Sequence, residues 1–293
     1  MKKLKQWNQK IKDTYKKSTR SALIVFVVIR TIILICMVTE IVFHQNYQNA
    51  FLCIVSLFLI SIPVLLESTT SIRLPSAIEI TIVLFAFSAE ILGEIGNFYG
   101  NIPFWDTILH TVNGFFAAAV GFGFIDILNK NAKRSHMAPQ FVAIVSFCFS
   151  MTIGVLWEFC EYGADKLVHT DTQKDTIVQS IYSVALNPEN VNKEIPVTGI
   201  DHTILYDKDG NEIAVIEGGY LDIGINDTMK DLFVNLIGAV VFSILGYLYL
   251  VKRDKYAFVE KLIIYDEPEA GGDTKALETA EATESAETAD TKN

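Results

Sequence analysis

Acidic residues and one histidine recur in pairs along the chain, at spacings that suit metal or acid–base chemistry. The members of each pair are three or four positions apart, so both lie on one face of any helix that contains them. The pairs are Glu90 and Glu94, Asp106 and His110, Glu158 and Glu161, and Asp227 and Asp231, and Asn235 follows one turn later. Carboxylate oxygens and an imidazole nitrogen bind Mg²⁺, Mn²⁺, Ca²⁺ or Zn²⁺, and they also exchange protons with substrates.

The candidate catalytic residues are Asp106, His110 and Glu158. The candidate metal ligands form a wider set, which consists of Glu90, Asp106, His110, Glu158, Glu161, Asp227 and Asp231, with Glu94 and Asn235 as further polar residues of the site. Two alternatives stay open. The group could share protons without a metal ion, or its members could be helix-end residues solvated by water and lipid headgroups. The second alternative fits Glu94, Glu161 and Asp227 better than the deeper residues.

Six apolar blocks must position these pairs. The chain has 293 residues and is 51% hydrophobic, and its apolar residues are concentrated at 22–43, 48–66, 77–96, 106–128, 139–162 and 229–251. A helix needs roughly 20 mainly apolar residues to cross about 30 Å of hydrocarbon. We therefore predict an all-α membrane protein, a bundle of six transmembrane helices in the lipid bilayer, with Pro63 interrupting the second span. Glycines on spans four and six indicate close helix packing, and they are Gly114, Gly121, Gly123, Gly238 and Gly246.

The lysines and arginines predict the orientation of the spans. Residues 1–20 contain eight basic residues and one acidic residue, Asp13, and basic residues also occur at 67–76, at 129–138 and after 251. Short loops rich in Lys and Arg stay in the cytoplasm. We therefore expect a plasma-membrane protein whose residues 1–21 and 252–293 are cytoplasmic, with 163–228 outside. The basic run adjoins a span, so it indicates topology and contact with anionic lipid, and it implies no nucleic-acid partner.

This orientation places the polar pairs of the last four spans at one level near the outer face. Seven carboxylates in a partly desolvated site cannot all stay ionised without a counter-charge. We expect His110 to be the only basic side chain in the outer half of any span. The group must then bind cations, hold several protons, or be open to water.

The segment at 163–228 is predicted to be a small α+β extracytoplasmic insert between the fifth and sixth spans. Residues 203–216 alternate around Asp209 and Gly210, which indicates a β-hairpin, and 175–186 has helical periodicity. Residues from Asp266 onward are rich in Ala, Glu and Thr and are predicted to be disordered. The cysteines Cys36, Cys53, Cys148 and Cys160 lie in apolar blocks, so we expect no disulfides. Cys160 could be a ligand, but a small buried apolar role is favoured.

Three sequence blocks resemble the YjdF-like bacterial membrane proteins. They are FWDTILHTVNGFFAA (104–118), GVLWEFCEYGADKL (154–167) and INDTMKDLFVNLIGA (225–239). The same order of motifs is more distantly similar to the VanZ-like membrane proteins, whose founding member is linked to teicoplanin resistance. The resemblance marks Asp106, His110, Gly114, Glu158, Glu161, Asp227, Asp231 and Asn235. It implies a shared site without an assigned activity, since the YjdF-like family has none established.

Three functions are compatible with these patterns, and it stays open whether the protein is an enzyme. The first is a divalent-metal-dependent activity on a lipid-linked or cell-envelope substrate at the outer leaflet. The second is a divalent-cation or proton-coupled transporter, which the one-sided placement of the polar pairs disfavours. The third is a non-catalytic envelope protein that binds a partner through its insert.

Overall fold

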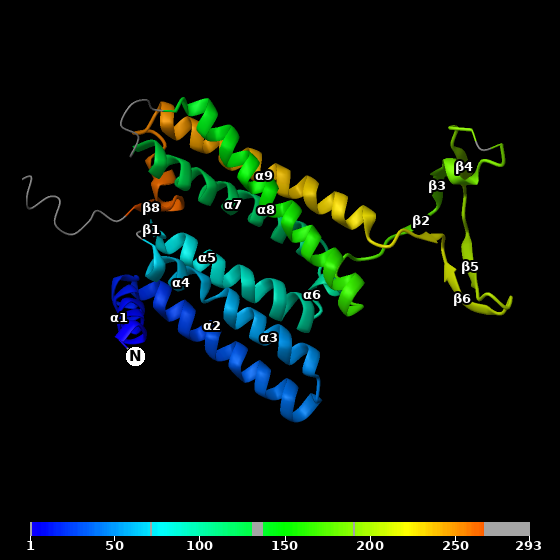
Figure 1. Ribbon diagram of the computed structural model, residues 1–293, viewed down its shortest axis with the longest axis horizontal. Helices are drawn as coiled ribbons and strands as arrows, with labels where there is room; N and C mark the ends of the chain where they lie inside the picture. The colour runs from blue at the N-terminus through cyan, green and yellow to red at the C-terminus, as the bar shows by residue number, and fades with distance from the viewer. Residues whose placement is uncertain (1, 71, 131–136, 190, 267–293) are drawn as a thin grey trace, which may run out of the picture. The chain divides into compact units, whose positions relative to one another are not determined.

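The computed structural model describes residues 2–70, 72–130, 137–189 and 191–266, and its helices confirm the six predicted spans (Figure 1). Six helical segments of the described residues are long and apolar enough to cross a membrane, and they are Arg20–His44, Tyr47–Thr69, Ser76–Ile95, Trp105–Lys130, Pro139–Val168 and Ile225–Val251. The acidic tail predicted to be disordered, and the basic residues Lys133 and Arg134 of the fourth-to-fifth connection, lie outside the described residues.

The chain forms two compact units, and the first contains the first three spans. Its helices are α1 (Lys2–Lys17), α2 (Arg20–Thr39), α3 (Tyr47–Leu59), α4 (Ile62–Thr69) and α5 (Ser76–Ala86), and α2 and α5 continue as π-helical turns η1 (Glu40–His44) and η2 (Phe87–Ile95). The break between α3 and α4 falls at Pro63, as predicted, because proline lacks the N–H that would continue the helix. The core of this unit includes Ile33, Cys53 and Ile60.

Two short strands join the polar ends of this first unit. Strand β1 (Ile72–Arg73) pairs antiparallel with β8 (Tyr265–Asp266), so the loop after the second span lies beside the segment that follows the sixth. The 3-10 turn η4 (Ala257–Leu262) precedes β8 and buries Val259. Because paired strands must share one side of the membrane, this contact agrees with the prediction that both segments lie on the same side, and which side that is stays a prediction.

The second unit contains the last three spans and the insert. Its helices are α6 (Phe98–Asn101), α7 (Trp105–Lys130), α8 (Pro139–Val168) and α9 (Ile225–Val251). Helix α8 continues six residues past the predicted end of its span at 162, and α9 begins four residues before the predicted start at 229. These extensions bring Asp165 and Asp227 within regular helix, on the same helices as Glu161 and Lys230.

Glycines let α7 and α9 pack at backbone contact, as predicted. A Cβ atom on Gly114 would lie 2.0 Å from the Asn235 carbonyl oxygen, and one on Gly238 would lie 2.1 Å from the Thr111 carbonyl oxygen. Real Cβ atoms do not approach so closely, so only glycine permits this separation of the helices. Deeper along the same seam, Phe122 and Phe242 are fully buried and pack edge to face with ring centroids 5.9 Å apart.

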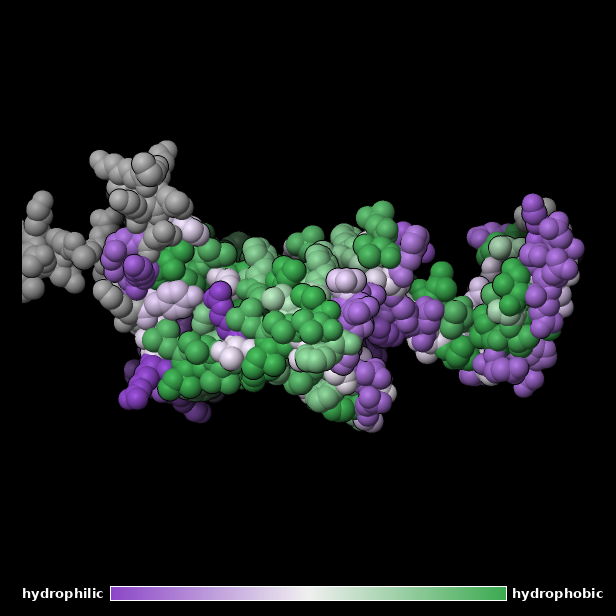
Figure 2. Space-filling model, turned by 90° about the horizontal axis from the view of Figure 1, so that it is seen from below, coloured by the Kyte–Doolittle hydropathy of each residue, from purple (hydrophilic) through white to green (hydrophobic). Residues whose placement is uncertain are grey.

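The insert is built from paired strands in its described residues. The pairs are β2 (Ile177–Val178) with β7 (Tyr220–Leu221), β3 (Ser180–Ser183) with β4 (Ile195–Thr198), and β5 (His202–Tyr206) with β6 (Glu212–Glu217). The hairpin predicted for 203–216 is present. The helix predicted for 175–186 is wrong, because these residues pair with distant strands and only the 3-10 turn η3 (Val184–Leu186) is helical. Hydrophilic residues cover the outer edge of these strands, whereas apolar ones cover the lengths of the helices (Figure 2).

Candidate functional site

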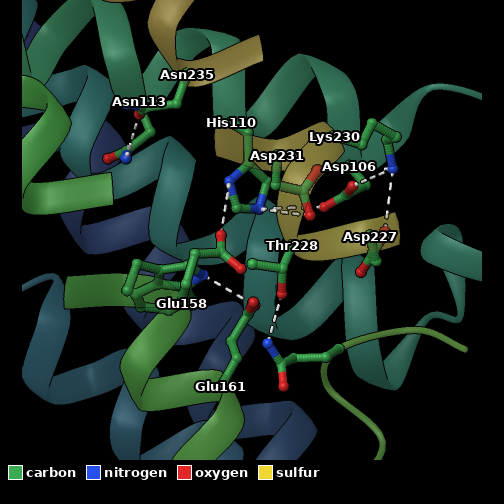
Figure 3. A network of polar contacts seen from close by, with 12 residues as sticks. Asp106, His110, Asn113, Glu158, Glu161, Asp227, Thr228, Lys230, Asp231 and Asn235 are labelled. Atoms are coloured by element: carbon green, nitrogen blue, oxygen red, sulfur yellow. Dashed lines mark hydrogen bonds and ion pairs between the residues drawn. The ribbon is translucent and has the colours of Figure 1, made fainter. Parts of the chain in front are cut away.

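His110 is the centre of a buried polar cluster in the second unit (Figure 3). Its side chain lies on α7 with a relative exposure of 9%. The imidazole Nε2 is 3.3 Å from Asp106 Oδ1, one turn earlier on the same helix, and 3.8 Å from Asp231 Oδ2 on α9. The other ring nitrogen, Nδ1, is 3.9 Å from Glu158 Oε1 on α8. Three helices thus converge on one imidazole, and all four residues were predicted for the site.

Close packing beneath the cluster holds these three helices in register. Ser150 on α8 donates its hydroxyl to the Gly114 carbonyl oxygen of α7 at 2.7 Å. Asn235 is fully buried on α9, where its Oδ1 accepts from Asn113 at 3.2 Å and its Nδ2 lies 3.6 Å from Met151 Sδ. Asn235 therefore links the helices one turn below Asp231, where it has a packing role.

Lys230 belongs to the cluster and was not predicted. Its ammonium group lies 2.8 Å from Asp106 Oδ2, 3.2 Å from Asp227 Oδ1 and 3.6 Å from Asp231 Oδ1. The expectation that His110 is the only basic side chain in the outer half of a span is wrong. A lysine at the second position of the predicted sixth span was visible in the sequence, and its spacing of three from Asp227 was the signal that could have found it.

Two buried carboxylate oxygens lack hydrogen bonds among the described residues. They are Oε2 of Glu158 and Oδ1 of Asp231, and the two side chains are only 4% and 1% exposed. A buried acceptor without a donor costs roughly 1–3 kcal/mol, and more when it is charged. The Lys230 ammonium near Asp231 offsets part of that cost, but two oxygens still face the interior of the cluster with unused capacity.

Asp106, His110 and Asp231 can offer three ligand atoms to one ion. These atoms all lie within 4.8 Å of one another. Ligands about 2.1 Å from a divalent ion are roughly 3.0–3.5 Å apart in octahedral or tetrahedral geometry. The separations of 3.3 and 3.8 Å from His110 Nε2 are close to that range, so small side-chain rotations would complete the set. The donor set therefore fits a divalent metal ion.

Glu158 faces the other nitrogen of the same ring, which separates it from this ligand set. A histidine that uses Nε2 for a metal commonly directs Nδ1–H to a carboxylate, which fixes the tautomer and the ring orientation. Glu158 lies on the Nδ1 side of the ring, at a 3.9 Å ion-pair distance that a small movement would shorten to a hydrogen bond. The geometry favours an orienting role for Glu158 over the ligand role that the sequence suggested.

The remaining candidate residues lie outside the contacts of His110. Glu161 accepts a hydrogen bond from Trp157 Nε1 at 2.9 Å, and Asp227 accepts one from the Lys174 backbone N–H at 3.0 Å. Glu90 and Glu94 lie on η2, in the first unit. Cys160 is exposed on α8, so the buried role predicted for it is wrong; its position on a membrane helix allows an apolar side chain to face lipid.

Comparison with known proteins agrees with the three sequence blocks. A family described as predicted membrane protein (DUF2238) matches residues 25–252. An uncharacterized protein of Thermotoga maritima is 30% identical over 126 residues, which make up 42% of this chain and 64% of that protein, so the chain spans less than two thirds of this relative. No solved structure matches. The VanZ-like similarity stays a resemblance. The match over most of the chain and all of the cluster shows that this multi-pass membrane protein belongs to the DUF2238, or YjdF-like, family.

Proposed function

We propose that Asp106, His110 and Asp231 bind one divalent metal ion, and that the protein is a metal-dependent enzyme that acts on a lipid-linked or cell-envelope substrate at the outer face of the membrane. The observation that carries the proposal is the convergence of three ligand atoms within 4.8 Å beside two buried carboxylate oxygens that accept no hydrogen bond among the described residues. The outer location rests on the distribution of Lys and Arg.

The donor chemistry narrows the choice of ion. Two carboxylates and one imidazole are a mixed set that suits Mn²⁺ or Zn²⁺ better than Ca²⁺, which takes six to eight oxygen ligands. Three protein ligands leave open positions, as in catalytic metal sites, where an ion supplies Lewis acidity to a bound water or substrate oxygen.

The neighbouring residues have supporting roles in this proposal. Glu158 orients the His110 ring through Nδ1 and can hold a proton there. Lys230 holds Oδ2 of Asp106 at 2.8 Å, which leaves Oδ1 to the ion. Asp227 binds Lys230 from the far side and thereby fixes the direction of its ammonium group.

Transport is less well supported, because the polar cluster does not continue along the seam of the second unit. Below Asn235, the described residues between α7 and α9 are mainly apolar. Ala118, Ala119, Phe122 and Phe242 are fully buried there. An ion or proton crossing at this seam would meet mainly aromatic and aliphatic side chains, with the Ser243 hydroxyl as a buried polar group among them, and crossing them would be costly.

Metal analysis of the purified protein tests the proposal. The protein is stripped with a chelator, reloaded with Mn²⁺ or Zn²⁺, and titrated by calorimetry in detergent. We expect one ion per chain for the wild type, and affinity at least about 100-fold weaker for His110→Ala, because a ligand is lost. His44→Ala is the matched control and should bind as the wild type does. Unchanged metal content in His110→Ala would reject the site.

Enzymatic activity needs its own measurement. The reloaded wild type is assayed for product release from lipid-linked substrates in membranes, beside His110→Ala. Turnover that requires both the ion and His110 supports an enzyme. A protein that binds the ion but moves it across proteoliposome membranes would instead be a transporter.

A further inference from the structure

A pocket of about 380 Å³ opens beside the cluster, in the loop that precedes α7. It is lined by Tyr99, Gly100, Asn101, Ile102, Pro103, Phe104, Trp105, Asp106, Thr107 and Lys230. Asp106 belongs both to the cluster and to the wall of this pocket, because its Oδ1 faces His110 and its Oδ2 faces Lys230. A ligand group in this pocket would therefore lie next to the metal site.

Lys230 is the cationic side chain in the lining of this pocket, and 46% of its side chain is exposed. An ammonium group has three N–H donors. With an ion bound, the charges of Asp106 and Asp231 would be matched by that ion. Asp227, at 3.2 Å, would then occupy one N–H of Lys230 and leave the others available to an anion. An ammonium group beside a metal site suits phosphate oxygens.

A second, apolar slot lies deeper along the same two helices. It measures about 230 Å³ and is lined by Thr111, Val112, Phe115, Phe116, Gly238 and Val241. Thr107 in the first pocket and Thr111 in the slot are one turn apart on α7, and the Thr111 hydroxyl donates to the Thr107 carbonyl oxygen at 2.7 Å. On α9, Lys230 and Val241 are 11 residues apart, which is about three turns and roughly 16 Å along one face.

The two cavities together match the polarity of a membrane lipid. The polar pocket lies at the start of α7 and α9, where the predicted spans reach the membrane boundary, and the slot lies inside the apolar span. A lipid places its charged headgroup and its hydrocarbon chain at these same two depths.

From this arrangement we propose that the cluster's ligand is a phosphorylated amphiphile, whose phosphate lies against Lys230, next to the metal site that includes Asp106, and whose hydrocarbon chain occupies the α7–α9 slot. The substrate class rests on the proposed metal-dependent function, and it narrows that function to lipid phosphates. The hydrocarbon chain would enter from the membrane. A soluble phosphate would therefore occupy the polar pocket and leave the slot empty.

Photocrosslinking in phosphatidylcholine nanodiscs tests this proposal. The probe is a dodecyl phosphate with a diazirine at the chain end, and a dodecanol carrying the same diazirine is its uncharged counterpart. We expect the phosphate probe to label α7 or α9 at least about tenfold more than the alcohol, a difference equal to about 1.4 kcal/mol. Lys230→Gln should abolish that preference. Equal labelling by both probes would overturn the proposed headgroup contact.

Two matched substitutions test the slot. Both Val240 and Val241 are exposed, but only Val241 lines the slot, so Val241→Trp adds bulk to the slot and Val240→Trp adds the same side chain beside it. We expect roughly tenfold lower labelling with Val241→Trp only. Equal effects of the two substitutions would overturn the proposed contact between the hydrocarbon chain and the slot. Displacement of the probe by inorganic phosphate as effectively as by unlabelled dodecyl phosphate would reject the lipid and identify a free phosphate.

Metal content measured on the same nanodiscs separates this proposal from the previous one. If labelling depends on Lys230 and Val241 but the protein binds no Mn²⁺, the proposed ligand is supported and the metal site is rejected. A protein that binds Mn²⁺ without any preference for the phosphate probe would retain the metal site and reject the ligand.

Discussion

Two of the acid–histidine pairs with a spacing of four residues have opposite chemical capacity, because their surroundings differ. Glu40 and His44 lie on η1 of the first unit, and Asp106 and His110 lie on α7 of the second. In the first pair, His44 Nδ1 is 2.9 Å from one oxygen of Glu40, and Asn49 Nδ2 donates to the other at 3.1 Å. Both carboxylate oxygens are satisfied, and the His44 side chain is 63% exposed. This pair therefore stabilises the end of a helix.

The second pair differs because two further helices add acids to it. Glu158 from α8 and Asp231 from α9 face the two nitrogens of the buried His110 ring, and each has an oxygen that accepts no hydrogen bond among the described residues. A spacing of four residues therefore brings an acid and a histidine together, but it does not make a site. Unused ligand capacity arises where several helices supply charges that they cannot satisfy among themselves.

Gly238→Ala should have the largest effect, because it removes the helix contact that distinguishes the second pair from the first. The new Cβ atom would lie 2.1 Å from the Thr111 carbonyl oxygen, so α7 and α9 must separate. We expect a loss of roughly 1–3 kcal/mol or more in stability, with loss of metal binding, since Asp231 would move away from His110. Thermal unfolding in detergent measures the first effect and calorimetry the second.

Gly163→Ala is the matched control for this substitution. No atom lies within 4 Å of the Cβ position at Gly163 on α8. Alanine also favours a helix over glycine by about 0.8–1 kcal/mol, so the unfolding temperature should stay equal or rise. If both alanine variants unfold at the same temperature as the wild type, close contact of α7 and α9 is not what assembles the cluster.

Glu158→Gln should have an intermediate effect, and it distinguishes an orienting residue from a ligand. If Glu158 only fixes the His110 ring through Nδ1, metal affinity should fall by about 10–100-fold. Glu161→Gln, three residues further along α8, should change the affinity little, because Glu161 pairs with Trp157. A loss as large as that of His110→Ala would show that Glu158 is itself a ligand.

The sequence predicts the six spans and the membership of the cluster better than it predicts the roles within it. Length and hydropathy are sums over about 20 residues, so the spans do not depend on any one contact. The spacing of Asp106 and His110 is likewise local. Whether a carboxylate faces Nδ1 or Nε2 depends on how α8 and α9 rotate against α7, and that follows from contacts such as Gly114 with Asn235.

Errors in the prediction occurred where long-range contacts override a local pattern. Residues 175–186 have helical periodicity, but Ile177 pairs with Leu221 and Ile181 with Val197, and these ladders fix an extended backbone. Lys230 lies just inside a predicted span, and local spacing relates it only to Asp227. Its role depends on Asp106, 124 residues earlier, and only the packing of α7 on α9 brings the two together.

The smallest expected effect concerns the junction between the insert and α9. The Asp106–His110 pair depends on this junction because α9 carries Asp231, whereas the Glu40–His44 pair does not depend on it. Asp222 accepts hydrogen bonds from the backbone N–H groups of Thr176 at 2.8 Å, Asn226 at 2.9 Å and Gly224 at 3.1 Å. Burial alone would raise the pKa of Asp222, but these donors outweigh it and hold the pKa below its ordinary range.

The sign of the pH effect follows from this lowered pKa. The ionised carboxylate stabilises the junction above the ordinary pKa of an aspartate, about 3.9, and the stabilisation is lost as the pH falls through the lower folded pKa. Asp222→Asn should open the junction by about 1–2 kcal/mol at pH 6, measured as faster amide exchange at Gly224 and Asn226, whereas the exposed Asp201→Asn should not. Because acid protonates the wild-type carboxyl, wild type and Asp222→Asn should converge as the pH approaches 2. A constant difference from pH 6 to pH 2 would show that the carboxylate charge does not hold the start of α9, and that the register of Asp227, Lys230 and Asp231 is set by helix packing alone.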